Sequence, residues 1–186
     1  MIRDYINGKW VDSSAKSSVP IINPANAQEI ESCPLGTATD ADRAVQAAQG
    51  AFHEWRNVPV MERVQYLFKL KTLMEANLED LAKIVTREHG KTISEARASV
   101  KRGMQMVETA TGMPTFQKGE FLEDIARGID CRTVRQPMGV FAGIAPFNFP
   151  AMVPFWFWPF AVASGNTFVL KPSERVPLTH QLIFDL

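Results

Sequence analysis

Short extended segments separated by turns are expected at the start of the chain. Asn7-Gly8 lies between Asp4–Ile6 and Lys9–Val11, and this dipeptide is typical of a type I′ hairpin, in which both central residues have positive φ. Val19–Ile22 and Glu29–Glu31 predict a second strand pair around the turn at 23–26. Residues 1–36 are therefore expected to form hairpins.

The period of the apolar positions then changes from two to between three and four, which predicts helices. The apolar residues of the four predicted helices lie within 44–55, 60–74, 81–85 and 100–110. Thr39 or Asp40 is expected to cap the first helix, Pro59 to open the second, and Asn77 to cap the third, which ends at His89-Gly90. The fourth is expected to start at Thr92 or Ser94 and to run to about Gly112, with Val100, Met104 and Val107 facing inward.

Residues 114–137 are irregular, with a probable strand at Cys131–Arg135, and a different pattern follows. Val140–Ala145 and Thr167–Leu170 are continuous apolar runs separated by a short helical stretch, which predicts a βαβ unit with two buried parallel strands. The fold class is therefore α/β, with hairpins and helices at 1–137 leading into a Rossmann-like parallel sheet at 138–186. Because the chain stops about a dozen residues into the second helix, this sheet is expected to be incomplete and the catalytic domain absent.

The interval Met138–Leu170 contains no charged residue and could by length cross a bilayer, which takes about 20 apolar residues. Its four prolines argue against one spanning helix, because each removes a backbone donor. They are Pro146, Pro150, Pro154 and Pro159. No membrane segment is therefore expected, and the N-terminus has charges rather than the apolar core of a signal peptide.

Composition excludes several classes of function. Twenty basic residues balance twenty acidic ones, so no net field attracts nucleic acid, and no partner of that kind is expected. Cys33 and Cys131 lie far apart and are interpreted as buried thiols in a reducing, cytoplasmic setting. The three histidines have no partner at metal-ligand spacing, so no metal site is expected.

The candidate chemistry lies just after the two apolar runs. Neither GxGxxG nor GxxxxGK[ST] is present; the residues there are Ala145–Pro150 and Leu170–Arg175. Ligands of open α/β sheets bind at the carboxyl ends of the strands, and a carboxylate such as Glu174 after the second strand suits the ribose hydroxyls of NAD. The alternative is that Lys171 and Glu174 form a solvated loop pair.

The strings APFNFP, GNTFVLKPSE and EHGK (Glu88–Lys91) resemble the aldehyde dehydrogenase superfamily in order and spacing, and the likeness covers essentially the whole chain. The combination GIAPFNFP and GNTF-x-LKPSER is most similar to methylmalonate-semialdehyde dehydrogenases. The resemblance implies oxidation of malonate or methylmalonate semialdehyde through a thiohemiacetal, with the hydride going to NAD. The acyl group is then expected to pass to coenzyme A with decarboxylation, giving acetyl-CoA or propionyl-CoA. It also implies a homo-oligomer, a dimer or tetramer, for the full-length enzyme.

The resemblance assigns roles to individual residues. Asn148 matches the asparagine whose amide stabilises the oxyanion, although an asparagine here could also serve only the turn. The matches at the cofactor are Ala145, Phe147, Lys171, Glu174 and Arg175. Arg102 matches an arginine for the substrate carboxylate, the alternative being a solvated helix charge beside Lys101.

The family nucleophile is a cysteine downstream of the KPSE loop, and neither Cys33 nor Cys131 matches its position. The 186-residue chain alone is therefore expected to be inactive. Two alternatives remain open. One is a hydrolytic semialdehyde dehydrogenase of the same superfamily, and the other is a non-catalytic nucleotide-binding fragment.

Overall fold

A computed structural model describes residues 1–186 and opens with two antiparallel hairpins. The first consists of β1 (Asp4–Ile6) and β2 (Lys9–Val11). Its turn residues Asn7 and Gly8 have φ values of 52° and 73°, as a type I′ turn requires. The second consists of β3 (Ser18–Asn23) and β4 (Gln28–Pro34). Both predicted hairpins are confirmed.

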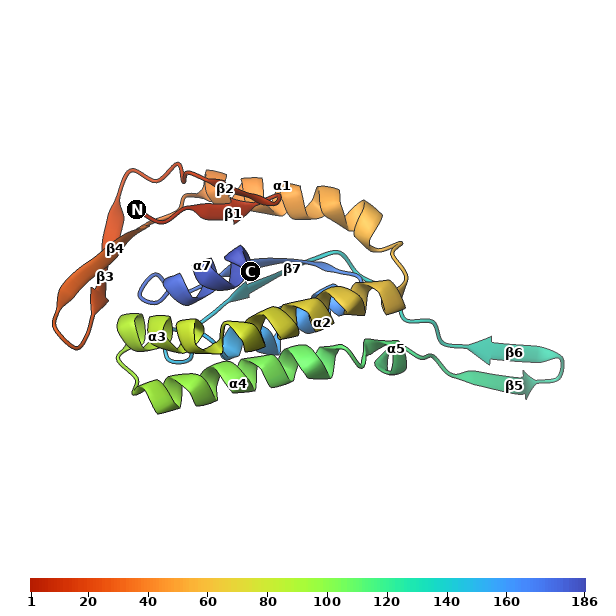
Figure 1. Ribbon diagram of the computed structural model, residues 1–186. Coiled ribbons are helices and arrows are strands. Elements are labelled where there is room, and N and C mark those ends of the chain that lie inside the picture. Colours follow the sequence, from red (N-terminus) through yellow and green to blue (C-terminus); the bar gives the residue numbers. More distant parts are fainter.

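Four long helices follow the hairpins. They are α1 (Ala38–Trp55), α2 (Val60–Ala76), α3 (Leu78–His89) and α4 (Ile93–Ala110), with the short α5 (Met113–Phe116) after them. Helices α2, α3 and α4 pack together, whereas α1 lies apart from them beside the first hairpin (Figure 1). Thr92 caps α4 as predicted, and Gly90, with φ 85°, ends α3. The prediction for α1 was wrong, because Thr37 is the cap and Asp40 lies at the third helical position as its partner in a capping box.

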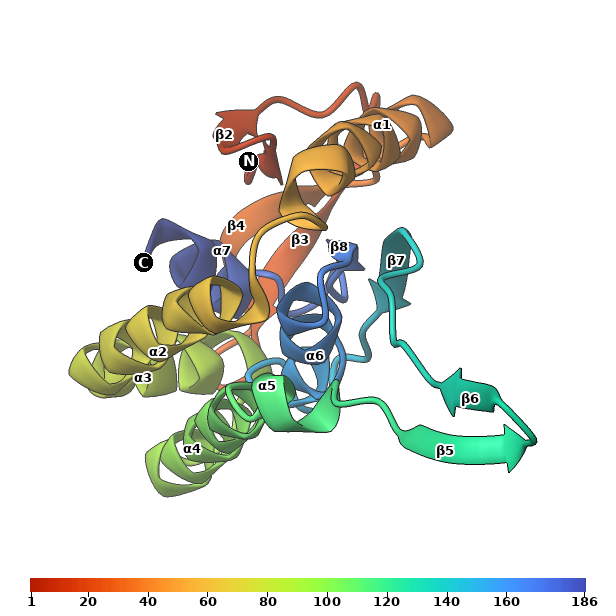
Figure 2. The ribbon, with the colours of Figure 1, turned by 90° about the vertical axis from the view of Figure 1, so that its right-hand side faces the viewer.

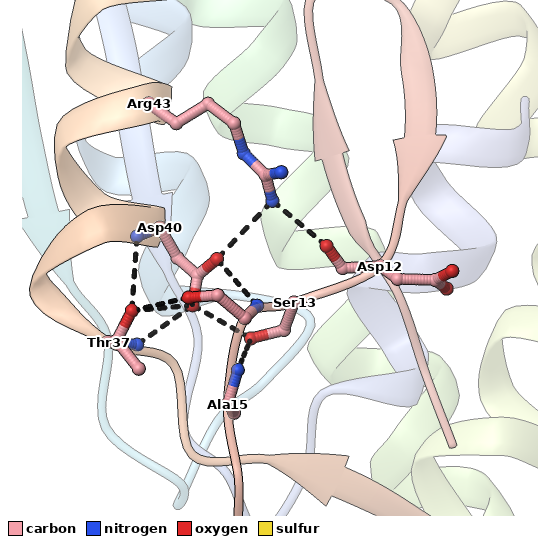
Figure 3. A network of polar contacts seen from close by, with 7 residues as sticks. Asp12, Ser13, Ala15, Thr37, Asp40 and Arg43 are labelled. Carbon is pink, nitrogen blue, oxygen red and sulfur yellow. Dashed lines mark hydrogen bonds and ion pairs between the residues drawn. The ribbon is translucent and has the colours of Figure 1, made fainter.

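Asp40 also joins the N-terminal segment to α1 (Figure 3). Its carboxylate accepts hydrogen bonds from the backbone N–H of Ser14 at 2.9 Å and from the hydroxyl of Ser13 at 2.8 Å. It also accepts from the backbone N–H of Thr37 at 2.9 Å. These donors hold the pKa of Asp40 well below its usual range, so the carboxylate is ionised at neutral pH.

A cluster of 16 buried apolar residues, mainly from α2, α3 and α4, forms the core. Val100, Met104 and Val107 belong to it, which confirms the predicted inward face of α4. Gly103 lies on the same face of α4. A Cβ at this position would be 2.3 Å from the carbonyl oxygen of Ala151 and 2.9 Å from the ring of Phe155. Only a residue without a side chain allows this close approach of α4 to the segment after β7.

A third hairpin, β5 (Phe121–Ala126) and β6 (Ile129–Arg132), stands out from the helices and exposes every residue (Figures 1 and 2). The strand predicted at Cys131–Arg135 corresponds to β6, which starts earlier, at Ile129, and ends at Arg132. Cys131 is exposed on β6, so the prediction of two buried thiols was wrong for it and right for Cys33. A hairpin with both faces in solvent gives its cysteine no core in which to be buried.

The predicted βαβ unit is present. It consists of β7 (Val140–Ile144), the 3₁₀ helix η1 (Val153–Trp156), α6 (Trp158–Ala163) and β8 (Thr167–Lys171), followed by α7 (Leu178–Asp185). The strands pair in parallel, with Val140 opposite Thr167 and Ile144 opposite Lys171. The buried amide of Asn166 fixes the start of the sheet by accepting from the backbone N–H groups of Met138 and Gly139.

The prediction that both strands are buried was wrong. Ile144 is 83% exposed and Phe141 is 39% exposed, although both belong to the apolar run. The parallel sheet has two strands, so β7 has a neighbour on one side only. A strand with one neighbour cannot bury its residues to the extent of a central strand. The domain division at residue 138 stays a prediction.

No helix combines enough length with enough hydropathy to cross a bilayer. The uncharged interval at 138–170 instead folds into two strands and two short helical segments.

Candidate functional site

The loops that follow β7 and β8 lie side by side at the carboxyl ends of the strands. The backbone N–H of Ala145 donates to the carbonyl of Lys171 at 2.9 Å, which extends the strand pairing by one bond. Farther out, the guanidinium of Arg175 lies 5.4 Å from the ring centroid of Phe147. The fold therefore brings together the five residues that the sequence assigned to a cofactor, at the place where open α/β sheets bind ligands.

Asn148 is exposed on the first of these loops, and its side-chain amide makes no hydrogen bond within the chain. Its backbone carbonyl is held instead, because the ammonium of Lys91 donates to it at 2.6 Å. The same ammonium lies 3.5 Å from the ring centroid of Phe149. The backbone of Asn148 is thus fixed while its amide is free to donate to another molecule, as an oxyanion donor must be.

Lys171 and Glu174 form an ion pair at 2.8 Å, and both side chains are about half exposed. The hydrogen bond from Lys171 lowers the pKa of Glu174, and a backbone hydrogen bond adds to the effect. Glu174 is therefore an ionised, accessible carboxylate just past β8. The exposed ion pair between Lys171 and Glu174 also fits the alternative interpretation of the sequence, a solvated loop pair.

Arg102 lies on the exposed face of α4, away from Val100 and Met104. No hydrogen bond or ion pair links its guanidinium to either strand-end loop. The structure does not bring Arg102 together with Asn148 or Glu174, and its assignment to the substrate carboxylate stays a prediction.

Glu88 is a polar residue of this region to which sequence reasoning gave no role. Its carboxylate is buried and accepts from the backbone N–H groups of Leu178 at 2.7 Å and Thr179 at 3.0 Å, and from the Thr179 hydroxyl. Burial raises the pKa of Glu88 to about 7, against these hydrogen bonds, which lower it. Its spacing from Leu81 and Val85 places it on the apolar stripe of α3, and that unusual position was the available signal.

His89 and Lys91 also contact the Asn148 loop. Burial and the nearby charge of Lys91 lower the pKa of His89, whereas a hydrogen bond to the backbone of Asn148 raises it. Burial also lowers the pKa of Lys91. The EHGK string therefore contacts both the Asn148 loop and the start of α7.

An open, mostly apolar groove of about 540 Å³ is a separate feature of the surface. Its aromatic lining comes from Phe141, Trp156, Phe157, Phe160 and Phe168. None of the seven site residues predicted from the sequence lines it. The candidate site is the pair of loops and not this groove.

The two cysteines do not form a nucleophilic centre. Burial raises the pKa of the Cys33 thiol to about 11, so the reactive thiolate is scarce at neutral pH. Cys131 lies on the projecting hairpin β5–β6, and no hydrogen bond links its side chain to either strand-end loop. No group of three or more His, Cys, Asp or Glu side chains is arranged to hold a metal ion.

Two parallel strands joined by a helical crossover, preceded by hairpins and helices, define an α/β protein. Residues 10–186 match the aldehyde dehydrogenase family. The chain belongs to that family.

Several relatives are similar to almost the whole of this chain. Malonate-semialdehyde dehydrogenase 2 of Bacillus mycoides is 49% identical over 185 residues, which are 100% of this chain and 38% of the relative. A methylmalonate-semialdehyde dehydrogenase structure from Oceanimonas doudoroffii is 40% identical, with a TM-score of 0.95 over 98% of this chain and 37% of that one. A Sinorhizobium meliloti structure complexed with NAD, and assigned as the same type of enzyme, is 39% identical with a TM-score of 0.93. That match covers 96% of this chain and 36% of the other chain. The chain thus spans little more than a third of its relatives.

Proposed function

We propose that this chain supplies the NAD-binding loops and the oxyanion donor of a malonate- or methylmalonate-semialdehyde dehydrogenase that transfers its acyl product to coenzyme A. The observation that carries the proposal is the pairing of the two loops: a free Asn148 amide lies on one and an ionised Glu174 on the other. The similarity to malonate-semialdehyde dehydrogenases at 49% identity, and to a structure complexed with NAD, supports this substrate class and cofactor.

The residues present fit NAD. Glu174 can accept hydrogen bonds from the ribose hydroxyls, and Lys171, which bonds Glu174 at 2.8 Å, can donate to the same sugar. Ala145, Phe147 and Arg175 would line the loops against the rest of the nucleotide. When bound, NAD accepts the hydride removed from the substrate carbon.

Asn148 would act on the substrate side. As the aldehyde carbon becomes tetrahedral, charge develops on its oxygen, and a neutral amide already in place stabilises that charge. Removal of one such donor typically costs about 3 kcal/mol of transition-state stabilisation. The nucleophilic thiol that attacks the aldehyde would come from outside these 186 residues, so the isolated chain should form no NADH from semialdehyde.

A product assay separates the acylating enzyme from a hydrolytic one. A full-length enzyme that contains this chain should form acetyl-CoA or propionyl-CoA from the semialdehyde only when coenzyme A is present, with NADH and carbon dioxide each in equal amount. Free carboxylic acid formed at the same rate without coenzyme A would instead support the hydrolytic alternative. Absence of NADH both with and without coenzyme A would support the non-catalytic alternative.

Arg102 provides a test of the substrate's acid group. If its guanidinium pairs with the substrate carboxylate, Arg102→Leu should lower kcat/KM for malonate semialdehyde about thirtyfold, or ~2 kcal/mol, and leave propanal almost unaffected. Arg102→Lys should recover only part of the loss, because an ammonium cannot form the bidentate contact. Equal losses on both aldehydes would mean that Arg102 supports the fold. The homo-oligomeric state and the cytoplasmic location stay predictions.

A further inference from the structure

The segment Glu88–Lys91 contacts the Asn148 loop and the start of α7, the helix that follows the Glu174 loop. Lys91 bonds the Asn148 carbonyl, and Glu88 bonds the first two backbone N–H groups of α7, which follows the Glu174 loop. We propose that Glu88 and Lys91 are positioning residues: Lys91 fixes the oxyanion donor Asn148, and Glu88 fixes the cofactor loop that carries Glu174. The inference rests on the proposed function.

The Lys91 contact is specific in its geometry. The Nζ atom lies 2.6 Å from the Asn148 carbonyl oxygen and 3.5 Å from the ring centroid of Phe149, so one ammonium holds two successive residues of the loop. A hydrogen bond from a charged donor is stronger than a neutral one, and the ring face adds a cation–π attraction. No carboxylate lies within ion-pair distance of Lys91, so its charge is directed at the loop.

Lys91 is itself held in place by the turn that precedes it. Gly90 adopts φ 85° at the end of α3, and a Cβ there would lie 2.6 Å from the Pro24 ring. The turn is therefore packed against the second hairpin, and Gly90 is required both for its conformation and for this contact. A short, packed connection from α3 limits how far the ammonium can move.

Glu88 acts on the other loop. A helix leaves its first N–H groups without partners inside the helix, and α7 has no side-chain cap of its own, since Pro177 occupies the cap position. The carboxylate of Glu88 serves as that cap from α3, with contacts of 2.7 and 3.0 Å to the N–H groups of Leu178 and Thr179. The cofactor loop thus runs between two fixed points, the end of β8 and the start of α7.

The two contacts start from one rigid place, since Glu88 ends the buried stripe of α3 and Lys91 lies three residues further on. A fixed separation between the oxyanion donor and the cofactor loop is what hydride transfer requires, because misplacement by about 1 Å can cost about a hundredfold in rate. The segment therefore sets the geometry of both loops without touching substrate or cofactor.

The decisive experiment is a double-mutant cycle on a full-length enzyme that contains this chain. Lys91→Met keeps the length of the side chain and removes the charge, and it should lower kcat about tenfold with little change in the Kd for NAD. In an Asn148→Ala background, the same substitution should cause little further loss, because no amide remains to be positioned. Lys91→Arg should restore part of kcat. Lys83→Met, at an exposed lysine of the preceding helix α3, is the matched control and should leave kcat unchanged.

Glu88 gives the complementary result. Glu88→Gln should raise the Kd for NAD about tenfold, measured by fluorescence titration, while kcat at saturating NAD changes less. Should Glu88→Gln fail to fold, Thr179→Val removes one donor of the same anchor and should move the Kd in the same direction by a smaller factor. An unchanged Kd in the folded variants would overturn the role of Glu88.

The outcomes of the cycle separate the two proposals. If Asn148→Ala lowers kcat and Lys91→Met lowers it further by the full tenfold, the losses are additive and the positioning role of Lys91 is wrong while the proposed function stands. If Asn148→Ala leaves kcat unchanged, the oxyanion assignment itself is wrong and the inference falls with it.

Discussion

The helices α2–α4 and the strand pair β7–β8 both contain many apolar residues. Those on the inward faces of the helices are buried, whereas several on β7 are exposed. Leu81 on α3 is fully buried, whereas Ile144 on β7 is 83% exposed. The helices meet one another and α6, so each apolar stripe has an opposing surface. The strands have each other on one side, and part of β7 lines the open apolar groove.

The apolar pattern of a segment therefore indicates how many neighbouring helices or strands it is suited to pack against. Its actual burial depends on which of those neighbours are present. A helix with one apolar stripe needs a single neighbour. A strand that is apolar on both faces needs a layer on each face and a strand on each edge. An exposed apolar patch of this kind marks a surface suited to contact with further protein.

The largest expected effect compares one truncation in each region. Leu81→Ala should lower the free energy of unfolding of this chain by about 3 kcal/mol, because it removes buried atoms and leaves a cavity. Ile144→Ala should change it by less than about 0.5 kcal/mol, because the side chain is mostly in water. Equilibrium urea unfolding measures both. A loss at Ile144 as large as that at Leu81 would contradict the exposed position of β7.

A second pair of variants tests the close contact between α4 and η1. Gly103→Ala places a methyl group against the Ala151 carbonyl and the Phe155 ring, and should cost about 2 kcal/mol of unfolding free energy. Gly50→Ala on α1 meets open space and should instead add about 0.5–1 kcal/mol, because alanine favours the helix. Stabilisation by both substitutions would show that α4 does not approach the Ala151 backbone.

A pH-dependent effect is expected in the buried region. His180 is buried without a hydrogen-bond partner, and burial lowers its pKa from 6.5 to about 4. A lowered pKa for a base means that the unfolded chain binds the proton first, so stability is full above pH 6.5 and is lost as the pH falls towards 4. From pH 6.5 to 5.5, the wild-type chain should lose about 1 kcal/mol relative to His180→Leu.

The contribution of Glu88 to stability changes with pH in the opposite direction. A variant that lacks only His180 is therefore needed for comparison. Its pKa is raised to about 7, so its contribution falls as the pH rises from its ordinary value near 4.5 towards 7. That contribution is common to the wild type and His180→Leu and cancels in the difference. His53, exposed on α1, provides the matched histidine control. Parallel pH profiles for wild type and His180→Leu would mean that His180 is not buried.

The parts of the fold that follow from short-range signals could be predicted from the sequence. The Asn7-Gly8 turn, the Thr92 cap and the Gly90 C-cap depend on residues within a few positions. The two parallel strands were also found, because each is a single apolar run. The cap of α1 was misplaced because Thr37, Thr39 and Asp40 are all suitable residues, and only the contacts of Asp40 with Ser13 and Ser14 decide between them.

The parts that could not be predicted depend on contacts between distant segments. The bond from Lys91 to Asn148 joins residues 57 positions apart, and that from Thr179 to Glu88 joins residues 91 positions apart. No local pattern contains such a pair. The exposure of β7 and of Cys131 depends on what lies beside each segment, which a strand's own composition does not reveal. The five residues assigned to a cofactor lie on two loops next to recognisable strands, so their proximity follows from the predicted βαβ unit. Their role at a cofactor stays a prediction.

The most direct test of the central claim is at Glu174. In a full-length enzyme that contains this chain, Glu174→Gln removes the carboxylate that would repel the 2′-phosphate of NADP and frees Lys171 to attract it. The ratio of kcat/KM for NAD to that for NADP should narrow about tenfold, equivalent to ~1.4 kcal/mol. The exposed Glu54, changed to glutamine on α1, is the control and should leave the ratio as in the wild type. A ratio that Glu174→Gln leaves unchanged would contradict the assignment of the strand-end loops to the cofactor.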